Sequence, residues 1–498
     1  MANKNYEKFV KHLSKIYDLR YASALLGWDQ ETFMPPKGAN FRGQQMSTIA
    51  SVCHELFVRE DFGDLMENLL QDSSLTAIEK KNVVLTSKDY FKAKKYSEDF
   101  VVRISKLTSA SFNAWAKARE ESNFKLFQPY LTEMVEMKKE ETSLLGFEQH
   151  PYDALIDQYE PDTTTEQLTV LFNDVRIQLV DFVKQISYRP QVDDSFLYIH
   201  YDKQQQWNFS MEMLKQMGYD FDAGRQDYSP HPFTTSFSMQ DVRVTTRGYE
   251  NDLRPMLWGS LHEGGHALYE QGLLVENYAL PSGDTISLGI HESQSRVWEN
   301  MIGRGLPFWK FNYNRLQKVF PQNLNDISLT QFYRGINKVQ PSFIRVEADE
   351  LTYHFHIMIR FEIEKGLMDG SIDVKNLPDI WNEKYKSYLN IEVPNDAQGV
   401  LQDVHWSHGS FGYFPTYSLG SFYSAQFFNQ ACKQIPDLIE NLENGNSASF
   451  LKWLREKIHI HGKMFTADEL CNNITGESLQ FSYFMKYAKE KFSAVYEF

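Results

Sequence analysis

Apolar residues recur at spacings of three and four along most of this chain, the spacing that places them on one face of an α-helix. Three examples of such runs are Leu168–Ile186, Phe343–Lys365 and Leu479–Phe492. The first follows the pattern Thr163-x-x-Glu166, which is typical of a capping box, and Gly366 is predicted to end the second. The sequence therefore predicts a mainly α-helical fold with a large helical body.

Alternating β-branched and aromatic residues, which are typical of a strand, are concentrated in Phe233–Thr246, between Pro232 and Gly248. Thr285–Ile290 is a second, shorter candidate strand. We therefore expect a small β-sheet in addition to the helices. Because neither a low-complexity linker nor an internal repeat interrupts the chain, residues 1–498 are predicted to form a single domain.

The composition excludes several classes of protein. Of the 498 residues, 42% are hydrophobic and 14% are aromatic, which is far too many for a disordered chain. The net charge of −15 and the lack of a Lys/Arg-rich block argue against binding to nucleic acid. The three cysteines are widely separated and form neither a disulfide framework nor a zinc knuckle.

The N-terminal segment Met1–Arg20 is charged and has helical spacing, but it lacks the apolar region of a signal peptide. No stretch of the chain approaches the roughly 20 apolar residues that a membrane-spanning helix needs. Together with the low cysteine content, these features predict a cytoplasmic protein that does not enter a membrane.

The most informative motif is His262-Glu263-Gly264-Gly265-His266. Histidines four residues apart project from one face of a helix, where neutral imidazoles can bind one Zn²⁺ and leave room for a water molecule. Glu263, next to the first histidine, can take a proton from that water. The alternative is an ordinary helix that carries two surface histidines.

The residues around this motif favour the metal site. Apolar residues on both sides of it predict a buried helix, and buried histidines and carboxylates need partners. Gly264 and Gly265 each cost a helix about 1 kcal/mol relative to alanine. Glycines at these two positions can admit the close approach of a substrate or of another backbone.

A catalytic zinc ion usually has three protein ligands. The best candidate for the third is Glu292, which opens an amphipathic helix and follows His266 at a distance sufficient for a loop and a returning helix. His291 is the competing ligand. Alternatively, Glu292 is a carboxylate that the helix dipole stabilises at a helix N-terminus.

Other short motifs surround the metal helix on both sides in the sequence. They are His231-Pro232-Phe233, Asp241-x-Arg243-x-Thr245, His291-Glu292-Ser293-Gln294, Ile344-Arg345-x-x-Ala348-Asp349 and Gly399-x-x-Gln402-Asp403-x-His405-Trp406. In these motifs, and in their order, the chain resembles the carboxypeptidase Taq family of zinc metallocarboxypeptidases. Similar segments elsewhere, such as Leu26–Glu31 and Phe414–Tyr417, extend the resemblance over most of the chain.

The resemblance implies a helical fold with a deep active-site groove and a small sheet beside the zinc helix. It also implies the removal of C-terminal amino acids one at a time, with broad specificity and poor action on proline. The implied cofactor is Zn²⁺, with Co²⁺ as an active substitute, and the implied assembly is a homodimer.

A carboxypeptidase has to recognise the free C-terminal carboxylate of its peptide substrate, for which an Arg with two parallel hydrogen bonds is best suited. Arg345 and Arg243 are the candidates, each inside one of the family-like motifs. The alternative for Arg345 is an ion pair within a helix, because Asp349 follows it by four residues.

The tetrahedral intermediate of amide hydrolysis carries an oxyanion, which a Tyr or His side chain can help to stabilise. Tyr413, His405 and His231 are the candidates for this role. Packing in the core is the alternative for Tyr413, and a buried structural histidine is the alternative for His405.

The sequence thus predicts a zinc-dependent carboxypeptidase in which His262, His266 and Glu292 hold the metal and Glu263 is the general base. The nearest alternative is a helical zinc oligopeptidase or endopeptidase, since these enzymes share the same type of metal helix. A metal-binding scaffold without activity is the alternative from another class.

Overall fold

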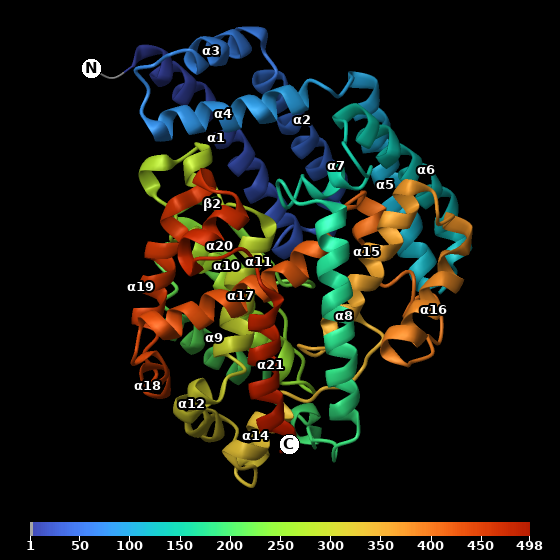
Figure 1. Cartoon of the computed structure of the whole chain (residues 1–498), viewed down its shortest axis with the longest axis vertical. Helices are drawn as coiled ribbons and strands as arrows, with labels where there is room; N and C mark the ends of the chain where they lie inside the picture. The colour runs from blue at the N-terminus through green and yellow to red at the C-terminus, as the bar shows by residue number, and fades with distance from the viewer. Residues whose placement is uncertain (1–2) are drawn as a thin grey trace. The chain divides into compact units, whose positions relative to one another are not determined.

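Helices dominate the computed structural model, which describes residues 3–498; Met1 and Ala2, the first residues of the predicted N-terminal helix, lie outside it (Figure 1). The chain is divided into two compact units, each built from three separate parts of the sequence. The predicted mainly helical fold with a small sheet is confirmed. The single domain over residues 1–498 stays a prediction.

The first unit comprises the described part of Met1–Lys94, together with Asp193–Ile336 and Tyr423–Leu479. Its strands are β1 (Gln226–Tyr228), β2 (Thr234–Ser238) and β3 (Asp241–Thr246). Its helices are α1 (Lys4–Thr32), α2 (Ala39–Phe57), α3 (Glu60–Leu70), α4 (Ala77–Ala93), α9 (Lys203–Met217), α10 (Arg254–Glu270), α11 (Leu288–Arg296), α12 (Leu306–Val319), α13 (Pro321–Leu324), α14 (Leu329–Gly335), α18 (Leu438–Glu443), α19 (Ala448–Lys457), α20 (Ala467–Thr475) and the later part of α17 (Phe414–Gln434).

The second unit comprises Lys95–Val192, Asn337–Phe422 and Gln480–Phe498. Its helices are α5 (Glu98–Glu120), α6 (Phe124–Leu145), α7 (Asp153–Ile156), α8 (Thr165–Ser187), α15 (Tyr353–Asp369), α16 (Leu377–Leu389), α21 (Phe481–Tyr496) and the start of α17. Helices α8 and α21, which are far apart in the sequence, run side by side (Figure 1). Among residues 3–498, no helix combines the length and the apolar character required to cross a bilayer.

The sheet of the first unit has the strand order β1-β3-β2, with β1 parallel and β2 antiparallel to β3. The predicted strand Phe233–Thr246 is a hairpin formed by β2 and β3, and β1 was not predicted. The predicted strand Thr285–Ile290 is wrong. Its middle residue, Ser287, caps α11 instead, because its hydroxyl accepts a hydrogen bond from the backbone N–H of Ile290.

Two helix boundaries differ from those that the pattern predicts. Helix α8 is capped by Thr164 and Gln167, whose side chains each bond the other's backbone N–H, so the capping box begins one residue later than expected. Helix α15 begins at Tyr353, because Asp349 accepts backbone hydrogen bonds ahead of it, and it ends before Gly370 with a left-handed φ of 82°. The helix predicted over Leu479–Phe492 is confirmed as α21.

Candidate metal centre

Helix α10 carries the histidine motif and is buried, as predicted. Pro255 lies in its first turn, where the missing N–H of proline costs no hydrogen bond. Leu257, Leu261 and Leu268 are fully buried, and the helix packs against α9, α11 and the strands β2 and β3. The motif is therefore held on a rigid element inside the first unit.

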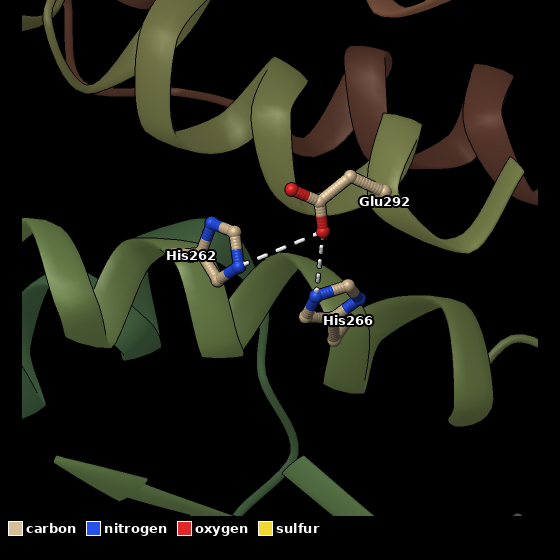
Figure 2. A group of neighbouring side chains, drawn as sticks. All are labelled: His262, His266 and Glu292. Carbon is tan, nitrogen blue, oxygen red and sulfur yellow. Dashed lines mark ion pairs between the residues drawn. The ribbon is translucent and has the colours of Figure 1, made fainter. Parts of the chain in front are cut away.

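The side chains of His262, His266 and Glu292 converge between α10 and α11 (Figure 2). Oε2 of Glu292 lies 3.8 Å from Nε2 of His262 and 3.4 Å from Nε2 of His266. One nitrogen or oxygen atom from each of the three residues lies within 4.8 Å of the others. Ligand atoms that surround one Zn²⁺ at about 2.0–2.2 Å have separations of this size, so the donor set fits the ion.

The helix-dipole alternative for Glu292 is not supported, because this residue is the fifth of α11 and Ser287 occupies the cap position. His291 is not the third donor either, because its ring nitrogens have other partners. Its Nδ1 lies 2.5 Å from Nδ1 of His266, and its Nε2 lies 2.9 Å from Oε1 of Glu270. Since both ring nitrogens of His291 are engaged, Glu292 remains as the third candidate ligand.

Further charged residues orient the donor group. Oε2 of Glu299 lies 2.9 Å from Nδ1 of His262, which leaves Nε2 of that histidine to face Glu292. Arg296 donates from Nε to Oε1 of Glu292 at 2.6 Å and from Nη1 to Glu299 at 3.2 Å. Arg296 therefore connects the ligand carboxylate to the carboxylate that orients the first histidine.

The carboxylates of this cluster remain ionised at neutral pH. Burial alone would raise the pKa of Glu299, but Arg296 and His262 hold it at about 2. The same two residues hold the pKa of Glu292 far below its usual range, despite burial. Burial lowers the pKa of His266 to about 3, which keeps this imidazole neutral. The same carboxylates raise the pKa of His262 to about 9 against the effect of burial, so the donor group attracts positive charge, and this suits a divalent cation.

The carboxylate of Glu263 is held in place by β2. The hydroxyl of Thr234 lies 2.7 Å from Oε2 of Glu263 and 2.9 Å from its main-chain oxygen. Burial raises the pKa of Glu263, and the neighbouring His262 opposes this shift. A carboxylate with a raised pKa accepts a proton more readily, which suits a general base.

The two glycines of the motif allow close packing of α10. A Cβ atom on Gly265 would lie 2.5 Å from the main-chain oxygen of Gln294 and 2.7 Å from Cα of Ser295, both in α11. Of the two possibilities given by the sequence, a substrate or another backbone, Gly265 therefore admits the backbone of α11. This close approach brings the two histidines of α10 to Glu292, because that residue belongs to the same helix α11.

We expect Gly265→Ala to lower the free energy of unfolding by about 1–3 kcal/mol, since the backbone of α11 cannot yield as a flexible side chain would. Gly259→Ala in the same helix is the matched control. The nearest atom to its new Cβ is 3.8 Å away, so alanine should stabilise α10 by up to about 1 kcal/mol. Denaturant unfolding of both variants tests this, and equal stabilities would contradict the packing argument.

The remaining candidates in the first unit are Arg243 and His231. Arg243 forms two hydrogen bonds with Asp241, from Nε at 2.8 Å and from Nη2 at 2.9 Å. Its guanidinium also lies over the rings of Trp28 and Phe237, 4.5 and 4.9 Å from their centroids. His231 is exposed, in the segment that leads into β2.

Arg345 lies in the second unit and pairs with Asp403 and not with Asp349, so the alternative of an intrahelical ion pair is not supported. The chain around it is not α-helical: residues 345–347 form a 3₁₀ turn. Its partner is Asp403, whose Oδ1 lies 2.9 Å from Nη2 of Arg345. Oδ2 of the same aspartate accepts a hydrogen bond from Nε of Arg360 at 2.6 Å. The carboxylate of Asp403 thus accepts hydrogen bonds from two buried guanidinium groups.

His405 and Tyr413 lie together in the second unit, with ring centroids 5.5 Å apart. Nε2 of His405 is 3.2 Å from the hydroxyl of Tyr417. Burial lowers the pKa of His405 to about 3, which Asp403 only partly opposes, so the imidazole is neutral. The candidate oxyanion residues of this unit thus form one aromatic cluster.

Comparison with known proteins decides the family. A family model described as Carboxypeptidase Taq (M32) metallopeptidase matches residues 8–492. The chain belongs to this family. Carboxypeptidase 1 of Bacillus subtilis is 40% identical over 99% of both chains, and Thermostable carboxypeptidase 1 of Thermus thermophilus is 38% identical over 99% of both. The structure of the M32 carboxypeptidase of Deinococcus radiodurans R1 matches with a TM-score of 0.98 at 34% identity, over 100% of both chains.

This metallocarboxypeptidase acts on peptides and uses a divalent metal ion, as its family implies. Several residues that orient its candidate metal centre were not found from the sequence, among them Arg296, Glu299 and Thr234. Glu299 could have been found, because it lies seven residues, or two helical turns, after Glu292 and so shares its face. Thr234 carries no such signal, because its contact with Glu263 depends on how the hairpin packs against α10.

Proposed function

We propose that this enzyme is a zinc-dependent carboxypeptidase that releases amino acids one at a time from the C-terminus of peptides, with broad specificity and poor action on proline. The observation that carries the proposal is the group of His262, His266 and Glu292, with Glu263 on the same helix. Two nitrogen donors and one carboxylate suit Zn²⁺, and Co²⁺ accepts the same donors.

A bound metal ion would supply Lewis-acid polarisation of the scissile carbonyl and make a water molecule more acidic. Glu263 then takes the proton from the attacking water and passes it to the leaving amine. Thr234 holds the carboxylate of Glu263 in a fixed orientation during this transfer. Glu299 keeps His262 oriented toward the metal, which maintains the geometry between one turnover and the next.

Arg345 is the better of the two candidates for binding the terminal carboxylate. Arg243 is already neutralised one-to-one by Asp241. Arg345 and Arg360 share a single carboxylate, that of Asp403, so this buried cluster has one positive charge in excess. An excess charge beside a planar fork of donors favours an anionic ligand. Tyr413, His405 and His231 remain our candidates for stabilising the oxyanion.

The homodimer and the cytoplasmic location also remain proposals, based on the family resemblance for the first and on the sequence for the second. Sedimentation analysis of the purified protein tests the assembly. A mass that corresponds to one chain of 58.3 kDa would contradict the dimer.

Mass spectrometry of peptide digests tests the activity. We expect a ladder of products shortened only from the C-terminus, which disappears when a chelator removes the metal and returns when Zn²⁺ is added. A C-terminally amidated peptide of the same sequence is the control, because it lacks the carboxylate that the enzyme must recognise. Internal cleavage of the amidated peptide would instead establish an endopeptidase.

A further inference from the structure

The imidazole of His266 begins a chain of hydrogen-bonded groups that leads away from the candidate metal centre. Its Nδ1 lies 2.5 Å from Nδ1 of His291, and Nε2 of His291 lies 2.9 Å from Oε1 of Glu270. The side chains of His266, His291 and Glu270 are 16%, 16% and 19% exposed, so all three groups are partly shielded from solvent.

The carboxylate of Glu270, at the end of this series of hydrogen bonds, determines which ring nitrogens carry protons. A carboxylate only accepts hydrogen bonds, so the nitrogen of His291 that faces Glu270 must carry a proton. In a neutral imidazole the other nitrogen, Nδ1, is then an acceptor. It can therefore bond Nδ1 of His266 only if that nitrogen is the donor. His266 is left with a bare Nε2, the atom that faces Glu292.

The opposite arrangement is unfavourable at Glu270, and at His266 it is incompatible with metal binding. If Nδ1 of a neutral His291 were the donor, its Nε2 would be bare and would face the carboxylate of Glu270, placing two acceptors 2.9 Å apart. His266 would then carry its proton on Nε2. A protonated nitrogen cannot bind a metal, because it has no free electron pair.

We propose that Glu270 and His291 are positioning residues that fix His266 in the tautomer with a free Nε2 and thereby raise the affinity of the protein for its metal. This inference rests on the proposed metal centre. The two ligand histidines are thus fixed in different ways. Glu299 bonds His262 directly, whereas Glu270 acts on His266 through an intervening imidazole.

The positions of these residues in the two helices agree with this role. Glu270 follows His266 by four residues in α10, so both side chains project from the same face. His291 precedes the candidate ligand Glu292 in α11. The hydrogen bonds therefore connect α10 and α11 beside the candidate metal centre, and they lie near the close approach that Gly265 allows.

Metal affinity tests the proposal without the need for enzymatic activity. The dissociation constant for Zn²⁺ is measured by competition with a chromophoric chelator for the wild type, Glu270→Ala, His291→Phe and the double variant. We expect each single variant to bind about tenfold more weakly or worse. We expect the double variant to bind no more weakly than His291→Phe, because Glu270 acts only through His291. Losses that multiply in the double variant would overturn the relay.

Glu276→Ala is the matched control, since Glu276 is an exposed glutamate just after α10 and should leave the affinity unchanged. Nitrogen NMR of the metal-free protein, labelled in histidine, gives a second readout that does not depend on metal. The signal assigned through His266→Asn should show a proton on Nδ1 in the wild type and a mixture of tautomers in Glu270→Ala. An unchanged tautomer and affinity in Glu270→Ala would overturn the inference, even if His291→Phe does not fold.

Different results would contradict the proposed zinc-dependent function and the proposed role of Glu270 and His291. A wild-type protein that binds no Zn²⁺ would contradict the proposed function, while the NMR readout would still decide whether Glu270 controls the tautomer of His266. A wild-type protein that binds Zn²⁺ with the same affinity as Glu270→Ala would leave the proposed function intact and contradict only the relay.

Discussion

Replacing Glu263 by Gln is expected to lower kcat by about two to four orders of magnitude, which is the usual contribution of a general acid–base group. Glutamine has nearly the same shape and can still accept the hydrogen bond from Thr234, but it cannot take a proton from water. Because Glu263 is not one of the three donor residues, the variant should retain its metal. Hydrolysis of a blocked dipeptide and metal analysis of the same sample give the two measurements.

Thr234→Val separates the presence of the base from its orientation. Valine has the shape of threonine but lacks the hydroxyl that bonds Glu263, so the carboxylate remains and loses its fixed position. We expect a smaller loss of kcat than in Glu263→Gln, again with full metal content. If Glu263→Gln keeps its metal and also keeps wild-type activity, Glu263 is not the base.

The donor residues of the candidate metal centre could be proposed from the sequence because the spacing that suggests them is local. The spacing of His262 and His266 places both on one helical face whatever the rest of the fold does. Glu292 required one further assumption, that a second helix returns to the first, and the glycine at position 265 makes that approach possible. The same glycine was noted in the sequence, but only the structure identifies α11 as what approaches it.

The errors arose where a local pattern has two physical meanings. Residues 285–290 are rich in β-branched and apolar side chains, yet the hydroxyl of Ser287 starts a helix there. Arg345 and Asp349 have the spacing of a helical ion pair, but Asp349 accepts hydrogen bonds from the backbone N–H groups of Leu351 and Thr352, just before the following helix. The true partner of Arg345, Asp403, lies 58 residues away in the sequence, and no periodicity relates them.

Replacing Asp403 by Asn is expected to destabilise the protein by about 3–5 kcal/mol, the usual cost of removing one partner from a buried ion pair. The side chain of Asp403 is 13% exposed, and those of Arg345 and Arg360 are 6% and 0% exposed. Asparagine keeps the shape of the residue but removes the carboxylate that the two guanidinium groups share. The shift in the midpoint of denaturant unfolding measures the loss.

Asp241→Asn is the matched control, because Asp241 also accepts two hydrogen bonds from one arginine but is 41% exposed. We expect a loss of about 0–1 kcal/mol there, since water screens an exposed pair. A comparable loss in both variants would show that burial is not the cause.

The effect of pH provides an independent check on the charge of Asp403. Burial alone would raise the pKa of Asp403, but Arg345 and Arg360 hold it well below its usual range in the folded protein. A depressed pKa stabilises the fold above the pKa of the unfolded chain, about 3.9, and this contribution is lost as the pH falls further. The stability difference between wild type and Asp403→Asn should therefore be constant near neutral pH and shrink below about pH 4. A difference that persists undiminished in acid would mean that the carboxylate acts through its shape and not through its charge.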